Sequence, residues 1–342
     1  MNVDNPVLEI RNLKKYFPRY SGIFRRKTGE VKAVDDISFK INSGETLGLV
    51  GESGCGKTTT GRTIMRDLDP TAGEIYFHDN GKVIDVVKLE GEKLREYWKK
   101  ARMIFQDPYS SLNPRMTVLN IVGEPLKCLK SMSEKEIKNK VRNLLETVGL
   151  DARHAERYPF SFSGGQRQRI GIARALALDP ELIVCDEPVS ALDVSLQAQV
   201  INLLEELQEE FKLAYLFIAH DLGIVKHISD RIAVMYVGKL VEVTDAETLF
   251  NFPLHPYTEA LLSSVPRPEA DYELNAISLE GEVPDPLDRP PGCCFHPRCR
   301  YSQEICINQE PELKNYGQNE KNPHFAACHF AQEINLRNID DF

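Results

Sequence analysis

The stretch GESGCGKT, Gly51 to Thr58, decides the fold of this chain. It fits the pattern G-x-x-x-x-G-K-[ST] and stands between an expected strand, ETLGLVG, and an expected helix at residues 58–68, as a phosphate-binding loop requires. Its glycines allow backbone N–H groups to close around phosphates, and the helix start adds the positive end of its dipole. Lys57 is expected to reach the terminal phosphates, and the Thr58 hydroxyl to ligate magnesium.

The composition of the chain limits its class. At 342 residues with 42% hydrophobic content, the length favours two folded units over one. The net charge of −9 argues against nucleic-acid binding, because proteins that bind nucleic acids usually carry a basic face. No apolar run approaches the roughly 18 residues that span a bilayer, and residues 1–12 lack the layout of a signal peptide. We therefore expect a soluble, intracellular chain that binds no nucleic acid.

The order of the expected elements predicts an α/β fold. Residues 7–50 look strand-rich around a basic loop, RRKTGE, and two more strands are expected near GEIYF and KVIDVVKL. Residues 108–161 look mostly helical, and their clearest helix opens with a capping box at Ser133 and Glu136. After them come a buried strand, ELIVCDEP, a helix, SLQAQVINLLEELQEEF, a strand, AYLFIAHD, and a hairpin, DRIAVMYVGKLVEV. Such alternation implies a parallel sheet covered on both faces.

The character of the chain changes near residues 245–253. Nine of the twenty prolines fall between Pro253 and Pro297, so this region is expected to be rich in loops. We therefore expect a first domain at residues 1–250, with a helical subdomain inserted at about 108–162, and a small C-terminal extension at 251–342.

Two carboxylates end the apolar stretch LIVCDE. Buried parallel strands present ligands at their carboxyl ends, so Asp186 is a candidate holder of magnesium and Glu187 a candidate to polarise an attacking water. His220 ends the next expected strand and could donate to a phosphate oxygen, although a lone histidine is more often structural. Cys55, inside the phosphate loop, is expected to be a small, inert residue.

A second phosphate-type helix start lies in FSGGQRQRIGIARAL, residues 162–176. Ser163, Gly164 and Gly165 open this helix and again offer a hydroxyl, bare N–H groups and a helix dipole. If each helix start serves a different nucleotide, the protein must meet a partner to complete each site. At this point the chain resembles the ATP-binding cassette ATPases, whose signature motif this is, and the resemblance covers about Val7 to Thr244.

That resemblance implies a P-loop cassette with a parallel-sheet core, an antiparallel β subdomain and an inserted helical subdomain. It further implies that two cassettes close head to tail on two molecules of MgATP. Phe17 is implied to stack on adenine, with Tyr16 as the alternative. The other implied ATP contacts are the loop residues and the next threonine: Gly51, Glu52, Ser53, Gly54, Cys55, Gly56, Lys57, Thr58 and Thr59.

The resemblance also assigns roles to the remaining motifs. Glu187 would support hydrolysis, His220 would be the switch histidine, and Gln106 in IFQDP would sense magnesium. Magnesium would be held by Thr58, Gln106 and Asp186. The residues implied to contact the ATP of the opposite subunit are Ser163, Gly164, Gly165 and Gln166, and Asp193 in SALD would communicate across the dimer.

The segment HPYTEALLSSVP, residues 255–266, narrows the resemblance. Together with IFQDPYSSLNPRMTV it resembles the ATPase subunits of oligopeptide and dipeptide permeases. The implied partners are a sister cassette ATPase, in a heterodimer or a homodimer, two membrane permease subunits and, indirectly, an external peptide-binding protein. Such a subunit would be peripheral to the cytoplasmic face of the membrane, and its substrate peptides are not legible in the sequence.

Two functions other than peptide import also use cassette motifs. A DNA-handling cassette ATPase of the long-armed type would place coiled coils between Lys57 and Ser163, but these residues are only 106 positions apart. A soluble cassette ATPase gated by a redox-sensing metal cluster also fits the motifs. Copurification with membrane permease subunits would distinguish the importer from this redox-gated ATPase.

The stretch PPGCCFHPRC, Pro290 to Cys299, begins a cysteine-rich region in the extension. Cys293, Cys299, Cys306 and Cys328 follow C-x5-C-x6-C-x21-C, and clustered thiols in a reducing compartment favour metal ligation. Spacing alone leaves zinc and an iron–sulfur cluster open. Resemblance to the peptide permease ATPases implies a 4Fe–4S cluster on these four and leaves Cys294 as the spare. Histidines 296, 324 and 329 are weaker candidates.

Overall fold

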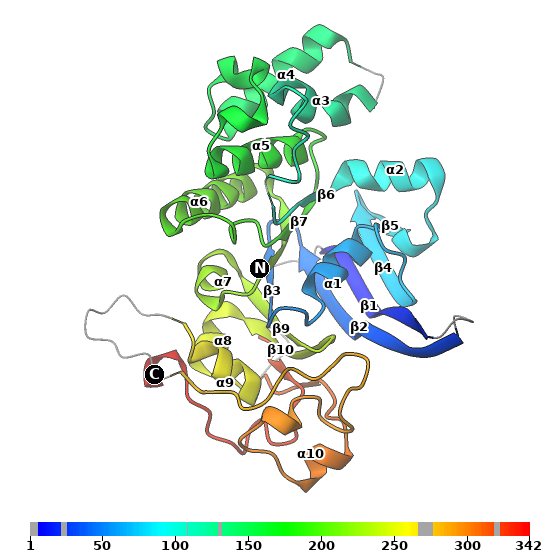
Figure 1. The fold of residues 1–342 in the computed structure, drawn as a ribbon, viewed down its shortest axis with the longest axis vertical. Coiled ribbons are helices and arrows are strands. Elements are labelled where there is room, and N and C mark those ends of the chain that lie inside the picture. The colour runs from blue at the N-terminus through cyan, green and yellow to red at the C-terminus, as the bar shows by residue number, and fades with distance from the viewer. Residues whose placement is uncertain (1–5, 22–25, 108, 129–131, 266–275, 318–321) are drawn as a thin grey trace. The chain divides into compact units, whose positions relative to one another are not determined.

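A computed structural model of the chain (Figure 1) describes residues 6–21, 26–107, 109–128, 132–265, 276–317 and 322–342. The chain forms two compact units. The first unit comprises Met1–Leu8, Ile41–Glu45 and Phe77–Ile218, and the second comprises Glu9–Lys40, Thr46–Tyr76 and Ala219–Phe342. The phosphate loop and the whole of the region 251–342 therefore belong to the second unit.

Three parallel strands form the sheet of the first unit. They lie in the order β6 (Ala101–Ile104), β7 (Leu182–Asp186) and β8 (Ala214–Ala219). Every residue of β7 and β8 is buried, as expected for the apolar runs of a parallel sheet covered on both faces. Helix α6 (Val194–Phe211) connects β7 to β8 and confirms the expected alternation of strand and helix.

The helical part of the first unit contains α3 (Val118–Cys128), α4 (Glu134–Thr147) and α5 (Gly164–Leu176), which pack together (Figure 1). Short 3-10 turns, η2 (Ala152–Glu156) and η3 (Pro159–Ser161), connect α4 to α5. The predicted capping box is confirmed: the Ser133 hydroxyl accepts the Glu136 N–H at 3.3 Å, and the Glu136 carboxylate accepts the Ser133 N–H at 2.7 Å. Helix α4 buries Ile137, Val141 and Leu145.

Other parts of the first unit differ from the sequence reading. Helix α2 (Gly91–Lys100) and strand β6 were not expected. Residues 109–117, expected to be mostly helical, form turns and bends, and Pro108, the expected start of the subdomain, lies outside the described residues. Of KVIDVVKL, only β5 (Lys82–Asp85) is a strand, because Asp85 accepts the Val87 N–H at 3.1 Å and starts a 3-10 turn, η1 (Val86–Lys88).

Long strands form one sheet of the second unit, in which β1 (Pro6–Ser21) lies between β2 (Arg26–Asn42) and β4 (Ala72–Asp79). Strand β2 begins at Arg26, so most of RRKTGE is strand rather than the predicted loop. Helix α1 (Lys57–Ile64) is shorter than expected, because Arg66 adopts a left-handed φ of +55° that ends the helical geometry.

The other sheet of the second unit is mixed. Strand β3 (Thr46–Val50) runs parallel to β9 (Arg231–Tyr236), which forms the expected antiparallel hairpin with β10 (Lys239–Asp245). The C-terminal region adds β12 (Phe325–Ala326) to β10 and then β11 (Lys314–Asn315), both antiparallel. The sequence did not predict β11 and β12, because strands of two residues leave no period in a sequence.

The remaining helices of the second unit are short: α7 (Leu222–Ile228), α8 (Ala246–Asn251), α9 (Pro256–Leu262) and α10 (Glu304–Asn308), with 3-10 turns η4 (His296–Arg298) and η5 (Ile339–Asp341). Among the described residues no helix is both long and apolar enough to cross a membrane.

Candidate functional site

The phosphate loop lies between β3 and α1, where the sequence placed it. Gly51 and Gly56 both have positive φ, and a Cβ at either would lie about 2 Å from a backbone oxygen: 2.1 Å at Gly51 and 2.0 Å at Gly56. Only glycine fits at such positions. The buried Lys57 ammonium donates to the carbonyls of Gly51 at 2.7 Å and Glu52 at 3.0 Å. The lysine therefore organises the loop from within.

Cys55 lies inside this loop and is buried. Burial raises the pKa of its thiol, against the opposing effect of the nearby Lys57 ammonium. The thiol is therefore protonated at neutral pH and is a weak nucleophile, in keeping with the expected inert residue.

The candidate magnesium and water-activating residues lie at the carboxyl ends of β6 and β7. Because Ile104 pairs with Cys185, the residues two positions further on, Gln106 and Glu187, come side by side. The Gln106 Nε2 donates to the Glu187 Oε2 at 2.8 Å. Asp186, the last residue of β7, is buried. Two of the expected residues are thus in direct contact, although they are 81 positions apart.

The backbone of Glu187 is strained. Its φ is +45°, in the left-handed region that a residue with a Cβ seldom adopts. The Glu187 N–H donates to the Ile218 carbonyl at 2.9 Å, which fixes the turn that ends the strand. Strain of this kind costs of order 1–3 kcal/mol and persists where surrounding contacts hold the geometry, so it marks Glu187 as a candidate functional residue. His220, by contrast, follows β8 as an exposed residue of the second unit.

The second phosphate-type helix start is formed as predicted. Ser163 is the N-cap of α5, and its N–H donates to the Gln166 Oε1 at 3.1 Å while its hydroxyl accepts the Gln166 N–H at 3.4 Å. Asp193 is the N-cap of α6 and accepts the Leu196 N–H at 3.0 Å. This hydrogen bond and that of the Ser195 hydroxyl lower the pKa of Asp193. Asp193 therefore has a capping role that the sequence reading did not assign.

The two candidate adenine-stacking residues are neighbours in β1, so their side chains leave opposite faces of the strand. The Tyr16 hydroxyl donates to the Asp35 carboxylate. The Phe17 ring lies 5.0 Å from the Lys15 ammonium and is half-buried. Tyr16 therefore already makes a hydrogen bond within the second unit, whereas the Phe17 ring has no polar group that needs a partner.

The four cysteines of the predicted metal site line one cavity of about 20 Å³ in the second unit, together with His255 and Phe295 among others. Burial raises the pKa of the Cys293 thiol to about 12 and those of Cys299 and Cys328 to about 11. Cys294 lines a neighbouring cavity instead. Across the described ranges, however, no three His, Cys, Asp or Glu side chains are grouped so as to hold a metal ion. The expected metal centre is therefore not formed in this structure.

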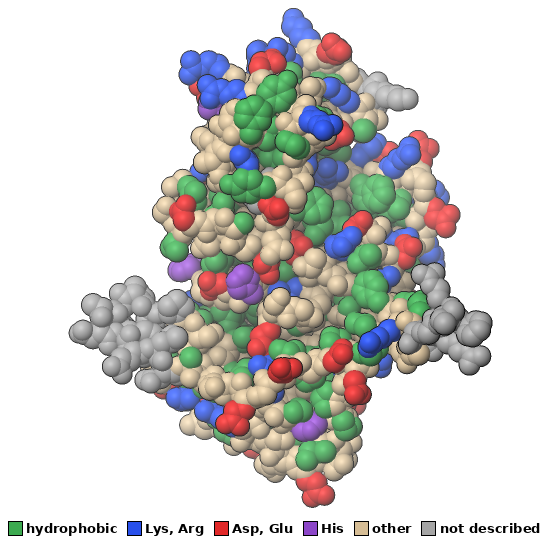
Figure 2. Space-filling model, in the orientation of Figure 1, with side chains coloured by type: hydrophobic (Ala, Val, Ile, Leu, Met, Phe, Trp, Pro, Cys, Tyr) green, Lys and Arg blue, Asp and Glu red, His purple; other side chains and the backbone are tan. Residues whose placement is uncertain are grey.

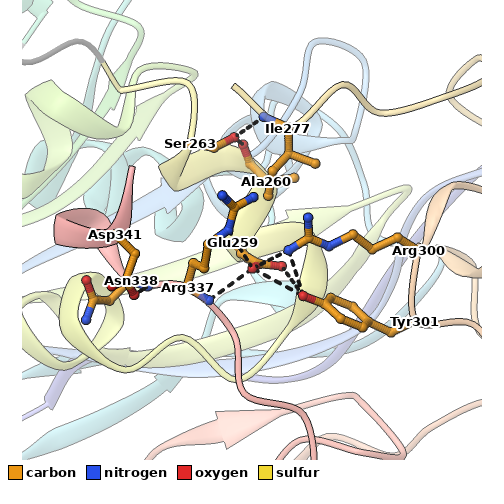
Figure 3. Close-up of polar contacts among 9 residues, drawn as sticks. All are labelled: Glu259, Ala260, Ser263, Ile277, Arg300, Tyr301, Arg337, Asn338 and Asp341. Carbon is orange, nitrogen blue, oxygen red and sulfur yellow. Dashed lines mark hydrogen bonds and ion pairs between the residues drawn. The ribbon is translucent and has the colours of Figure 1, made fainter. Parts of the chain in front are cut away.

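The buried carboxylate of Glu259 on α9 joins several late segments of the chain (Figure 3). Glu259 Oε1 accepts the Arg300 Nη2 at 2.6 Å and the Arg337 N–H at 3.0 Å, and the Tyr301 hydroxyl lies 3.3 Å from Oε2. One turn further along, the Ser263 hydroxyl accepts the N–H of Ile277 at 2.9 Å. This role of Glu259 was not predicted from the sequence, since no local pattern marks a buried acid with distant partners.

Taken separately, the two units supply the parts of an ATP-binding cassette: a phosphate loop, strand-end carboxylates with their glutamine, and the signature helix start. The chain matches the family model for the ABC transporter over residues 34–190 and that for the oligopeptide/dipeptide transporter C-terminal region over residues 241–306.

Curated relatives agree with the family models. The chain is 56% identical to the oligopeptide transport ATP-binding protein AppF of Bacillus subtilis, over 94% of this chain and 97% of the relative. It is 46% identical to the dipeptide transport ATP-binding protein DppF of Escherichia coli, over 92% of this chain and 93% of the relative.

Solved structures share the fold. The dimeric ATP-binding cassette MJ0796, in a post-hydrolysis state bound to ADP and Pi, aligns with a TM-score of 0.60 and 28% identity, covering 70% of this chain and 98% of that one. The chain CbiO1 of Clostridium perfringens, from the ABC transporter complex cbiONQ, aligns with a TM-score of 0.60 and 25% identity, covering 72% and 91%. The chain therefore belongs to the ATP-binding subunits of oligopeptide and dipeptide ABC transporters, which are ATPases that drive transport.

Proposed function

We propose that this chain powers the import of oligopeptides or dipeptides as one ATPase of a head-to-tail cassette dimer. The observation that carries the proposal is that the chain has both a phosphate loop and the Ser163 helix start on α5. The match of residues 241–306 to the peptide-transporter C-terminal region, and the names of the relatives, support peptides as the cargo. We also propose that the chain divides into a cassette domain at residues 1–250, with a helical subdomain inserted at about 108–162, and a C-terminal extension at 251–342.

Each ATP is bound by residues of two subunits. Phe17 stacks on adenine, and Lys57 with the loop N–H groups holds the phosphates. The partner's signature residues, equivalent to Ser163, Gly164, Gly165 and Gln166, complete the site from the other side, and Asp193 in SALD communicates across the dimer. Because each half-site is incomplete alone, ATP binding favours the closed dimer and hydrolysis releases it.

The residues at the strand ends carry the hydrolysis. Thr58, Gln106 and Asp186 would hold magnesium, which would supply charge neutralisation at the phosphates. Glu187 orients the attacking water and accepts its proton, and the hydrogen bond from Gln106 sets the position of the Glu187 carboxylate. His220 donates to a phosphate oxygen as the switch histidine.

Exposed aromatic side chains in the first unit support docking to membrane permease subunits at the cytoplasmic face. Phe160 is 70% exposed and stacks on Tyr158 with ring centroids 5.8 Å apart, and Tyr109 is 57% exposed. Figure 2 shows hydrophobic side chains among the charged ones over the helical part of the first unit. Tyr109 and Phe105 flank the segment that carries Gln106, so a partner bound there is adjacent to the Glu187 hydrogen bond. Exposed aromatic clusters of this kind are typical of interfaces.

The cysteine cavity is proposed to bind a 4Fe–4S cluster. The proposal is supported by the residue types alone: Cys293, Cys299, Cys306 and Cys328 line one cavity and a cubane takes four thiolates, although in the described residues these side chains are not grouped so as to hold a metal ion. The cavity is smaller than a cubane, so the surrounding side chains must open to admit it. Binding also requires the thiols to lose their protons, so cluster uptake is pH-dependent.

The metal content of anaerobically purified protein tests this cofactor. We expect brown protein with about four irons and four sulfides per chain. Colourless protein that contains one zinc ion would show that these cysteines bind zinc rather than a cluster. A Cys294→Ser variant is the matched control, since Cys294 lines the neighbouring cavity and its loss is expected to leave the iron content unchanged.

Copurification tests the transport function. When the chain is coexpressed with candidate permease subunits and a candidate sister ATPase from the same genome, we expect it to purify as a membrane complex. Peptide together with its external binding protein is expected to stimulate the ATPase activity of this complex. ATPase activity that needs no permease subunit and responds to oxidant would instead support the soluble, redox-gated alternative. DNA-stimulated activity would support the DNA-handling alternative.

A further inference from the structure

We infer that Arg298 and Tyr257, both in the C-terminal region, are positioning residues for the phosphate loop and set its affinity for ATP. The inference rests on the proposed role of that loop in binding ATP. Both residues act on Glu52, the second residue of the loop, one through its side chain and the other through its backbone.

The side-chain contact is a two-point ion pair. The Arg298 Nη1 donates to the Glu52 Oε2 at 2.7 Å, and the Arg298 Nη2 donates to the Glu52 Oε1 at 3.0 Å. The Arg298 side chain is only 6% exposed, so solvent screens this pair weakly. Two parallel charge-assisted hydrogen bonds fix the direction of a carboxylate as well as its distance. The pair joins residues 246 positions apart.

The backbone of Glu52 is held at two further points. Its N–H donates to the hydroxyl of Tyr257, on α9, at 2.8 Å. Its carbonyl accepts the Lys57 ammonium at 3.0 Å. A chain of hydrogen bonds therefore runs from Arg298 and Tyr257 through one loop residue to the lysine that is proposed to bind the phosphates.

A rigid aromatic cluster supports both positioning residues. The buried rings of Tyr236, Tyr257 and Phe295 lie with centroids 4.7 to 5.4 Å apart. The Tyr236 hydroxyl lies 3.4 Å from the Arg298 Nη1. Arg298 itself ends the short turn η4, directly after Phe295, His296 and Pro297. Fixed side chains lose little freedom when the loop binds a ligand, which is what preorganisation requires.

The ion pair affects ATP through charge and through geometry. Glu52 is an acidic residue in a loop that must accept a polyphosphate, and a free carboxylate there repels the ligand. Arg298 neutralises this carboxylate and holds it in one direction, while Tyr257 aligns the backbone that carries the Lys57 contact. Loss of Arg298 is therefore expected to weaken ATP binding more than it slows the chemical step, which takes place at Glu187.

The experiment measures MgATP affinity and steady-state hydrolysis by the purified full-length chain carrying Arg298→Gln. We expect the dissociation constant and the KM for ATP to rise about tenfold, as for loss of a charge-assisted pair, and kcat to change less than about threefold. Arg298→Lys keeps the charge but loses the two-point contact, so it is expected to show an intermediate effect of about threefold. Tyr257→Phe, which keeps the ring and removes the acceptor, is also expected to raise KM.

A matched control and a double variant separate positioning from general damage. Arg300→Gln also removes one arginine from the same region, but Arg300 pairs with Glu259 rather than with the loop, so KM for ATP is expected to stay unchanged. In the background of Glu52→Gln, Arg298→Gln is expected to raise KM less than about threefold, because the charge that it neutralises is already gone.

Equal effects of Arg298→Gln and Arg300→Gln, or an unchanged KM in Arg298→Gln, would overturn the inference. If Arg298→Gln does not fold, Arg298→Lys replaces it. The same comparison is then made between Arg298→Lys alone and Arg298→Lys in the Glu52→Gln background. Lys57→Ala checks the premise: unchanged ATP binding in that variant shows that the loop is not the ATP site, which is a failure of the proposed function rather than of the Arg298 contact.

Discussion

The strand ends of the first unit and the C-terminal region of the second are held by different kinds of interaction. Gln106 and Glu187 meet because β6 and β7 pair in a fixed backbone register within a buried sheet. The C-terminal region has helices of five to seven residues and strands of two, and it is tied down by side chains such as Arg298 on Glu52 and Arg300 on Glu259.

This difference separates two ways to position functional groups. A backbone ladder places residues at strand ends almost regardless of the neighbouring side chains, so it tolerates substitution outside the reacting groups. Long-range ion pairs depend on each partner, because removing one leaves a buried charge unpaired. We therefore expect substitutions at the strand ends to change the chemistry, and substitutions in the C-terminal region to change folding and, only at Arg298 and Tyr257, the geometry of the phosphate loop.

The largest effect is expected from a substitution at the strand ends of the first unit. Glu187→Gln is expected to lower ATP turnover at least about 100-fold, because the amide cannot accept a proton, while MgATP binding is retained. Phosphate release and equilibrium nucleotide binding measure the two quantities. Glu181→Gln is the control, since Glu181 precedes the same strand and pairs with Lys100 at 2.5 Å. Normal hydrolysis by Glu187→Gln would remove this residue from its proposed role.

The next effect tests the side-chain network of the C-terminal region. Glu259→Gln removes a charge that is 1% exposed and leaves Arg300 and Arg337 without their carboxylate. We expect a local loss of about 2 kcal/mol, as for hydrogen bonds to a charged group, because the arginines left without their partner are 42% and 40% exposed and can be solvated. Hydrogen exchange of residues 290–340 in the full chain measures it, and Glu312→Gln, on an exposed acid 3.7 Å from Lys314, is the control. Exchange unchanged by Glu259→Gln would show that the ion pairs do not hold this region.

The smallest effect compares two identical caps. Ser163→Ala and Ser133→Ala each remove the hydroxyl of a capping box, at the starts of α5 and α4, and each is expected to lower the free energy of unfolding by about 1 kcal/mol. Only Ser163→Ala is also expected to lower ATPase activity, because its hydroxyl faces the partner's ATP in the proposed dimer. Equal activity in the two variants would contradict a nucleotide role for Ser163.

Much of the nucleotide-binding half was predictable because its signals are local. Each of these signals acts over a few residues: the glycines of the phosphate loop, the buried run before Asp186, the capping box at Ser133 and the helix start at Ser163. Strand β6 was missed because a four-residue strand carries too little pattern to stand out. Helix α2 was missed because it buries only Tyr97, so its sequence carries little of the apolar face that marks a helix. The contact of Gln106 with Glu187 followed only from the register of two distant strands.

The C-terminal region was harder to predict, because its contacts join residues that are far apart in the sequence. Its cysteine spacing indicated a shared site, and the structure brings those four residues to one cavity without forming a metal-binding group in the described residues. Nothing in the sequence marked Glu242, whose buried carboxylate accepts the N–H groups of Leu254 and His255 and contacts His324 at 2.7 Å.

By itself, the sequence determined that this chain has a phosphate-binding loop, because phosphate binding by backbone N–H groups demands glycines at fixed spacing and a helix directly after them. The cassette type followed from the resemblance of residues 162–176 to the family's signature motif. Only the tertiary structure decided that the second residue of that loop is held by Arg298 and Tyr257. Ion pairs between residues more than 200 positions apart have no local signature, since they depend on where the folded backbone brings each side chain.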